Sequence, residues 1–178
     1  MAGELEPPAA PVRVVDYDPA WPEVFRAEAA RIRGALGERA LLLEHAGSTS
    51  VPGLAAKPVI DIVLAVADSS AEAAYASALE TAGYRLRIRE PEWHEHRLFQ
   101  GREDRVNLHV FPEGCPEIGR MLRFRDWLRS NAADRDLYAR TKRELAQRDW
   151  KSVQEYADAK ADVVAEILAR AEDLRPPG

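Results

Sequence analysis

The stretch of residues 41–66 constrains the fold of this chain more than any other part of its sequence. It starts with the apolar run Leu41-Leu42-Leu43, passes through a turn of small residues at positions 46–50, and returns to an apolar run at positions 59–66. Short runs of leucine, valine and isoleucine bounded by glycine and proline are typical of buried strands. The stretch is therefore predicted to form a strand, a tight polar turn, a short irregular loop and a second strand.

One carboxylate, Asp61, lies inside the second apolar run. Burying a charged carboxylate among β-branched residues costs free energy unless a partner compensates for it. One interpretation is that Asp61 accepts hydrogen bonds from the backbone of the turn, because most buried polar groups are hydrogen-bonded. The alternative is that the turn at 47–50 holds phosphate through its exposed N–H groups, while Asp61 holds a cation.

The rest of the chain shows the periodic patterns of further helices and strands. Apolar residues recur every three or four positions over 19–36, which predicts a helix that ends at Gly37. The sequence also predicts a short strand at 12–15, a helix from Asp68 to about residue 82, strands at 84–88, 97–100 and 106–111 (the last two as a hairpin), and helices at 117–129, 132–150 and 152–174. Strands followed by three consecutive helices predict an α+β fold: a mixed β-sheet with helices packed on one side and a C-terminal run of three helices.

Length and composition favour one domain and exclude several classes of protein. One domain is predicted over residues 12–174 of the 178, preceded by a Pro- and Ala-rich disordered tail at 1–11. The net charge of −5 gives no electrostatic basis for general nucleic-acid binding. The single cysteine fits a reducing compartment, and no apolar run approaches the roughly 20 residues that span a bilayer. We therefore expect a cytoplasmic protein with no membrane partner.

The turn belongs to a longer string that resembles a known family. Residues 45–62 read HAGSTSVPGLAAKPVIDI, and the other matching pieces are YDPAW at 17–21, NLHV at 107–110 and FRDWL at 124–128. Together they resemble the GrpB-like family, a branch of the nucleotidyltransferase superfamily, over about residues 12 to 171. The resemblance implies a nucleotidyltransferase-like sheet that binds a nucleotide triphosphate or another phosphorylated small molecule.

The resemblance leaves two functions open. One is the transfer of a nucleotidyl group to a small acceptor. The other is a catalytically inactive binding or accessory module on the same fold, since related domains also occur fused to dephospho-coenzyme A kinase. A metal-dependent hydrolase that uses Asp61 and the histidines is a more distant third alternative.

The resemblance also implies a metal site with an incomplete set of ligands. Active members of the superfamily carry two carboxylates separated by one residue on the strand after the turn, and a third on a neighbouring strand. Here Val63 occupies the second position and His109 the third. The candidate metal ligands are Asp61, Glu44 and His109, with Mg²⁺ or Mn²⁺ as the expected ion, although one aspartate with one histidine suits Mg²⁺ poorly. Asp61 and His109 are the candidate catalytic residues.

The predicted phosphate-binding residues combine the turn with two cations. Lysine offers a point charge and arginine a fork that suits phosphate oxygens. The predicted set is Gly47, Ser48, Thr49, Ser50, Lys57 and Arg97. For Lys57 and Arg97 the alternative is an ordinary solvated surface charge.

The histidines allow both structural and functional interpretations. His45 precedes the turn and could orient Asp61 or a phosphate. His109 lies between apolar neighbours, so a satisfied core histidine is as good an interpretation as a site residue. The pair His94 and His96 has no third ligand nearby in the sequence, and a solvated loop is the commoner outcome.

Overall fold

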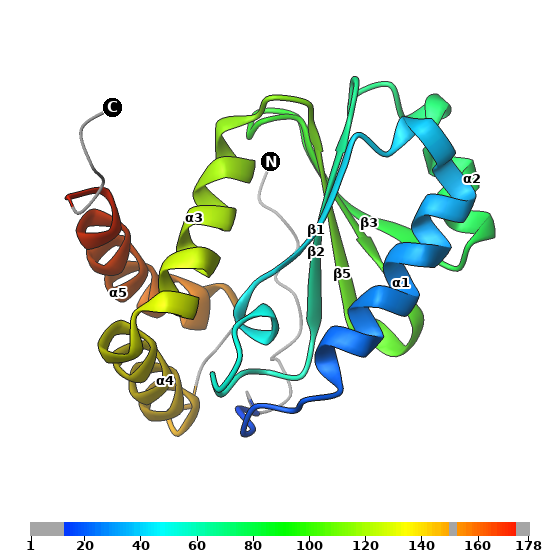
Figure 1. Ribbon diagram of the computed structural model, residues 1–178. Coiled ribbons are helices and arrows are strands. Elements are labelled where there is room, and N and C mark those ends of the chain that lie inside the picture. Colours follow the sequence, from blue (N-terminus) through cyan, green and yellow to red (C-terminus); the bar gives the residue numbers. More distant parts are fainter. Residues whose placement is uncertain (1–12, 150–152, 174–178) are drawn as a thin grey trace.

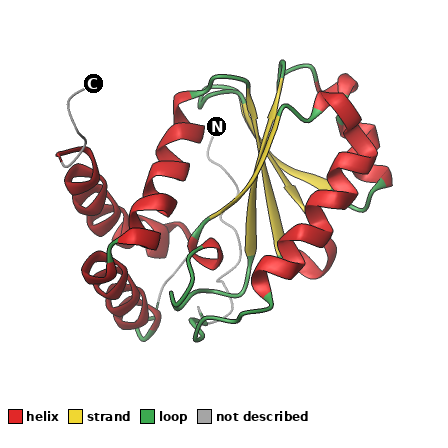
Figure 2. Cartoon of the chain, in the orientation of Figure 1, coloured by secondary structure: helices red, strands yellow, loops and turns green. Residues whose placement is uncertain are grey.

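The computed structural model describes residues 13–149 and 153–173, so the predicted tail at 1–11 lies outside the described residues. Its centre is one mixed sheet of five strands in the order β1-β2-β5-β4-β3 (Figures 1 and 2). The strands are β1 Leu42–Ala46, β2 Ile60–Val66, β3 Arg85–Glu90, β4 His96–Gln100 and β5 Val106–Pro112. Only the β2–β5 pair is parallel, and the predicted β4–β5 hairpin is confirmed.

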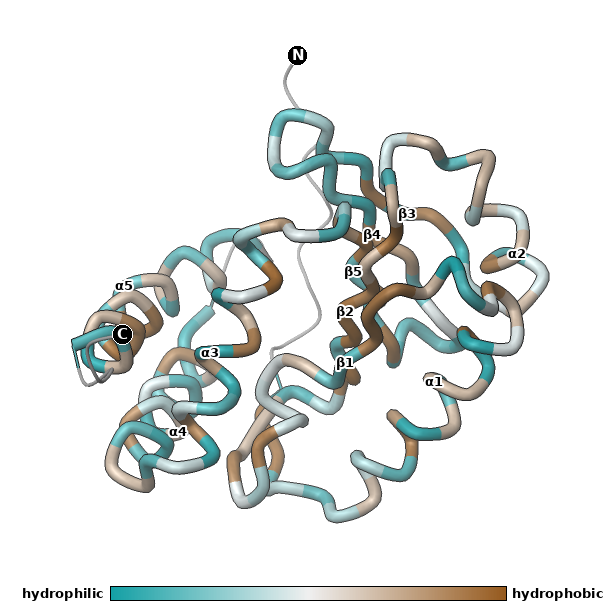
Figure 3. Tube along the Cα trace, turned by 45° about the horizontal axis from the view of Figure 1, so that its top comes forward, coloured by the Kyte–Doolittle hydropathy of each residue, from teal (hydrophilic) through white to brown (hydrophobic). Residues whose placement is uncertain are grey.

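The middle of the sheet is built from the most apolar strands. β2 is buried along its whole length except at Asp61, which is half-buried, and it lies between β1 and β5. A strand covered on both faces needs a continuous apolar run rather than an alternating one, which is the pattern seen at 60–66. Figure 3 shows the hydrophobic segments gathered in β1 and β2, between the more polar helices.

Two helices cover one face of the sheet. They are α1 Trp21–Leu36 and the short α2 Ala76–Thr81, which follows a single 3₁₀ turn. Trp21, Ile32 and Leu79 pack there against alternate residues of β2 and β5, including Ile62 and Leu108. The predicted helix at 19–36 is confirmed from Trp21 onward, and Asp18 caps the preceding turn by accepting a hydrogen bond from the backbone N–H of Ala20 at 2.8 Å.

The three C-terminal helices lie on the other face (Figure 1). They are α3 Pro116–Ser130, α4 Ala132–Ala146 and α5 Val153–Asp173, and they confirm the predicted run of three. Ile118 of α3 packs on Val63 and Phe111 of the sheet, while α4 and α5 pack on the loop after the turn through Leu54. The α+β class is confirmed, but helices cover both faces rather than one.

The remaining differences from the predicted elements are local. Residue 12 of the predicted strand at 12–15 lies outside the described residues, and the remainder forms only an isolated bridge between Val15 and Ala56. The helix predicted to reach residue 150 ends at Ala146, and Trp150 lies outside the described residues. In the described part of the chain, no helix is both long and apolar enough to cross a membrane.

Candidate functional site

The turn at 47–50 and Asp61 lie against each other. Gly47 has a φ of 68°, and a Cβ placed on it would be 2.4 Å from Asp61 Oδ2. Any other residue would therefore be strained and would also collide with the carboxylate. A single 3₁₀ turn, Ser48–Ser50, follows at once. Gly47 is the residue that allows the backbone of the turn to approach the strand carboxylate this closely.

The turn, Asp61 and the C-terminal helices enclose a polar cleft of about 190 Å³. Its walls come from the turn, from the first residues of β2 and β5, and from α4 and α5. The lining residues are Ser48, Thr49, Lys57, Val59, Asp61, Asn107, Lys142, Tyr156 and Lys160. The cleft thus holds one carboxylate and three lysines, two of them from helices.

The two helical lysines are presented by the same local arrangement. Tyr138 and Lys142 on α4 are four residues apart, as are Tyr156 and Lys160 on α5. The Lys142 ammonium lies 4.6 Å from the centre of the Tyr138 ring, and the Lys160 ammonium lies 4.7 Å from the centre of the Tyr156 ring. Residues at this spacing meet on one face of a helix, where the ring attracts the ammonium.

Lys142 is an unusual lysine because it is only 3% exposed. Its Nζ donates to the carbonyl of Ala55 at 2.6 Å. Burial, reinforced by the charges of Lys160 and Arg143, lowers its pKa to about 7, and Asp61 acts in the opposite direction. An amine of this kind gains from an anionic ligand, because the ligand stabilises its charged form.

The pKa of Lys160 is also lowered, chiefly by burial. The charge of Lys57 adds to that effect, and Asp61 opposes it. Both helical lysines therefore respond to the other charges of the cleft. Perturbed groups that converge on a cleft are a general mark of functional sites.

Behind Asp61, a row of hydrogen-bonded groups crosses the sheet. Asp61 Oδ1 lies 3.1 Å from His109 Nε2, and His109 Nδ1 lies 3.1 Å from His96 Nε2. His96 Nδ1 in turn lies 2.9 Å from Glu90 Oε1. The four groups come from β2, β5, β4 and β3, so the row connects the cleft to the edge of the sheet.

The row needs one more proton than two neutral imidazoles carry. Ionised Asp61 and Glu90 only accept, so each facing imidazole nitrogen must donate. The bond between the imidazoles needs one further N–H, so all three bonds form only when one ring carries two protons. The pKa of His96 is lowered to about 4 by burial and by the charge of His109, with Glu90 acting in the opposite direction. A second proton on the His96 ring is therefore disfavoured.

The structure corrects the predicted position of Arg97. Neighbouring residues of β4 point to opposite faces, so His96 faces the Asp61 side while Arg97 points to the side of α1 and α2. Arg97 is 4% exposed and donates to Glu72 Oε2 at 2.8 Å and to Glu95 Oε2 at 3.1 Å. It is a buried structural arginine that does not line the cleft.

His45 also lies outside the cleft, on the face opposite Asp61. Its ring stacks on Phe25 at 4.8 Å and shares a hydrogen bond of 2.9 Å with Thr49 Oγ1. Burial lowers its pKa to about 4, an effect that the charge of Asp61 partly offsets. His45 therefore supports the turn from behind rather than contacting a ligand.

The predicted metal ligands do not form a donor set that fits a metal ion. Glu44 lies on the Asp61 face, but its Oε2 accepts from Arg125 Nη1 at 2.8 Å. Val63, in the second carboxylate position, is fully buried. Within the described residues, no group of three or more His, Cys, Asp or Glu side chains could hold a metal. Asp61 and His109 alone remain of the predicted ligands, and they are already paired with each other.

The sequence prediction missed the residues that the C-terminal helices bring to the cleft. Lys142, Lys160 and Tyr156 were assigned to helices but not to a site. A signal was present: Tyr-Ala-x-x-Lys occurs at 138–142 and again at 156–160, each time with a lysine one turn beyond a buried tyrosine. When two amphipathic helices each carry a lysine beside their buried face, the two lysines can line one polar cleft between the helices and the rest of the fold.

Comparison with other sequences gives a consistent match over nearly the whole chain. The family model described as GrpB protein matches residues 11–170. A UPF0157 protein of Halalkalibacterium halodurans is 60% identical over 169 residues, covering 95% of this chain and 87% of that relative. A dephospho-CoA kinase of Mycolicibacterium paratuberculosis is 32% identical over 190 residues, covering 92% of this chain but only 47% of the kinase.

Comparison with solved structures gives the same family and a more distant fold likeness. The crystal structure of a conserved GrpB protein from Enterococcus faecalis matches with a TM-score of 0.77 and 34% identity, over 89% of this chain and 98% of that chain. Crystal structures of the Cid1 poly(U) polymerase match with a TM-score of 0.46 and 12% identity, over 73% of this chain and 45% of that chain. The second likeness is too distant to say anything about activity.

Proposed function

The chain belongs to the GrpB protein family, and we propose that its cleft binds a nucleoside triphosphate or another phosphorylated small molecule. The observation that carries this proposal is the convergence of the 47–50 turn, Asp61 and three lysines on one cleft of about 190 Å³. Phosphate oxygens need closely approaching N–H and hydroxyl donors together with positive charge. The turn and the lysines offer both.

The arrangement also supports a reaction, the transfer of a nucleotidyl group to a small acceptor. In that reaction an acceptor hydroxyl attacks the α-phosphorus, pyrophosphate leaves, and the hydroxyl proton must go to a base. Asp61 is the carboxylate in the cleft, and we assign the role of base to it, with His109 orienting it through their 3.1 Å contact. The expected Mg²⁺ or Mn²⁺ stays a prediction, since the protein donors do not form a site for it.

Substitution of Gly47 tests the proposed function. Gly47→Ala adds a methyl group that collides with the Asp61 carboxylate and strains the turn. Binding of labelled nucleoside triphosphates, measured by equilibrium dialysis, should weaken by at least about tenfold. Gly34→Ala is the matched control, because Gly34 lies on α1 with no atom within 4 Å of an added Cβ. Failure of the unmodified protein to bind any nucleoside triphosphate, with or without Mg²⁺, would exclude the proposal.

A catalytically inactive binding module is the second candidate. Two observations favour it: the buried Val63 in place of a second carboxylate, and the match to less than half of a dephospho-CoA kinase. A screen of the four nucleoside triphosphates for pyrophosphate release in the presence of hydroxyl-bearing acceptors separates the two functions. Binding without any product in that screen favours the module, and product formation rules it out.

A further inference from the structure

We infer that Lys57, Lys142 and Lys160 neutralise the phosphate groups of the bound ligand in place of metal ions, which makes the cleft a metal-independent polyphosphate site. The inference deepens the proposed function and rests on it. It assigns a role to two helical lysines that lie more than 80 residues beyond the turn in the sequence. It also accounts for the incomplete set of carboxylates.

The charges of the cleft carry the first step of this inference. Three lysine side chains line the cleft, whereas Asp61 is the only acidic residue among its described lining residues and is already paired with His109. A metal centre that binds a triphosphate has more carboxylates than basic side chains. The clustered carboxylates bind the metal ions, and the metal ions then bind the phosphate groups. The lining residues therefore attract a polyanion directly.

The second step of this inference rests on how the lysine side chains are held in place. Burying an ammonium costs free energy, and Lys142 is 3% exposed and donates to the Ala55 carbonyl. The neighbouring helix repeats the same Tyr–Lys pair, so both ammonium groups are held over aromatic rings. Holding two long side chains in place before a ligand arrives reduces the entropy lost when it binds. The repeated pair is a preorganised anion site.

The role of Asp61 separates this inference from metal-dependent binding. As a metal ligand, Asp61 would be needed for binding. In a lysine-based site its negative charge opposes the phosphate groups, so Asp61→Asn should strengthen binding. The two accounts thus predict effects of opposite sign for one isosteric substitution.

The test is calorimetric titration of the full chain with inorganic tripolyphosphate, in EDTA and again in excess MgCl₂. Binding should occur in EDTA, and Mg²⁺ should leave it unchanged or weaken it, because Mg²⁺ competes for the phosphate oxygens. Asp61→Asn should tighten binding in EDTA by about threefold to tenfold. Lys142→Met and Lys160→Met should each weaken it by about tenfold or more. Lys160 is only partly buried, so its variant remains informative if Lys142→Met fails to fold.

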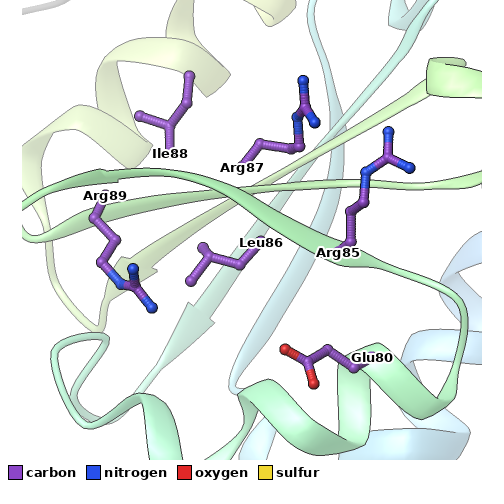
Figure 4. Close-up of a pocket in the computed structure, with 6 residues that line it drawn as sticks. All are labelled: Glu80, Arg85, Leu86, Arg87, Ile88 and Arg89. Atoms are coloured by element: carbon purple, nitrogen blue, oxygen red, sulfur yellow. The ribbon is translucent and has the colours of Figure 1, made fainter. Parts of the chain in front are cut away.

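The control for loss of charge is Arg87→Met. Arg87 lies in a separate groove of about 400 Å³ along the edge strand β3, beside Arg85 and Arg89 (Figure 4). Arg87→Met should leave tripolyphosphate binding unchanged, and a loss equal to that of Lys160→Met would place the anion elsewhere and overturn the inference.

Two further outcomes separate the inference from the proposed function. Binding that needs Mg²⁺ and disappears in Asp61→Asn would overturn the inference and leave the proposed function standing. The absence of binding of tripolyphosphate and of every nucleoside triphosphate, in both buffers, would overturn both.

Discussion

At the scale of single residues, the site depends on a few side chains whose environments determine their chemistry. Gly47 is required by its positive φ and by the Asp61 carboxylate beside it. The sequence allowed the turn and Asp61 to be grouped because both belong to one strand–turn–strand stretch. It did not reveal Lys142, because a lysine on a helix is usually solvated, whereas Lys142 is buried and donates to the Ala55 carbonyl.

His45 should make the folded protein sensitive to acid. Its pKa in the folded chain is about 4, below the usual 6.5, so the unfolded chain binds more protons between these values. The stability is therefore full above pH 6.5 and falls as the pH drops towards 4, by about 2 kcal/mol at pH 5. In urea denaturation, His45→Gln should lose part of this acid sensitivity. The exposed His94, replaced by Asn, serves as the control and should retain it.

The hydrogen-bonded row from Asp61 to Glu90 makes a prediction about tautomers. With both carboxylates ionised, the imidazole ¹⁵N shifts should show a proton on His109 Nε2, which faces Asp61, and a proton on His96 Nδ1, which faces Glu90. Glu90→Gln should alter the His96 signals most, since it removes the charge that holds that proton. A His96 ring that carries its proton on Nε2 and none on Nδ1 would contradict the proposed arrangement.

At the scale of secondary-structure elements, periodicity predicts most of the helices and strands. It does not predict which face of each element points towards the cleft. The strand His96–Gln100 illustrates the limit. Alternation along it shows that His96 and Arg97 point to opposite sides, but not which side carries the cleft. That depends on the sheet order, which places β4 next to β5 and so brings His96 to His109. Local sequence carries no information about such long-range neighbours.

Helix α3 should stabilise the turn through Arg125. Its Nη1 donates to Glu44 Oε2 at 2.8 Å and to the carbonyl of His45 at 3.0 Å, and its side chain is 10% exposed. Arg125→Leu leaves both acceptors without this donor and should lower the free energy of unfolding by about 1–3 kcal/mol.

The comparison for this prediction is Arg120→Leu on the same helix. Arg120 is 49% exposed and pairs with Glu117 one turn away, so its loss should change the free energy by about 0.5 kcal/mol or less. Chemical denaturation of both variants measures the difference. Equal effects would show that the Arg125 contacts do not brace the turn.

At the scale of the whole molecule, the cleft exists because the sheet is covered on both faces. α1 and α2 form the main core on one side, and this leaves the other side for the turn, Asp61 and the C-terminal helices. The lysines of α4 and α5 reach the cleft only when these helices pack on the loop around Leu54. Local sequence patterns predict these helices, but they do not predict that the helices pack on this loop and form one wall of the cleft.

The most direct measurement is a crystal structure of the protein with a non-hydrolysable nucleoside triphosphate. We predict phosphate oxygens within hydrogen-bonding distance of the backbone N–H groups of Ser48 and Thr49 and of the Lys142 and Lys160 side-chain nitrogens. Phosphates bound instead along the arginines of β3, or a cleft that stays empty at saturating ligand, would contradict the account.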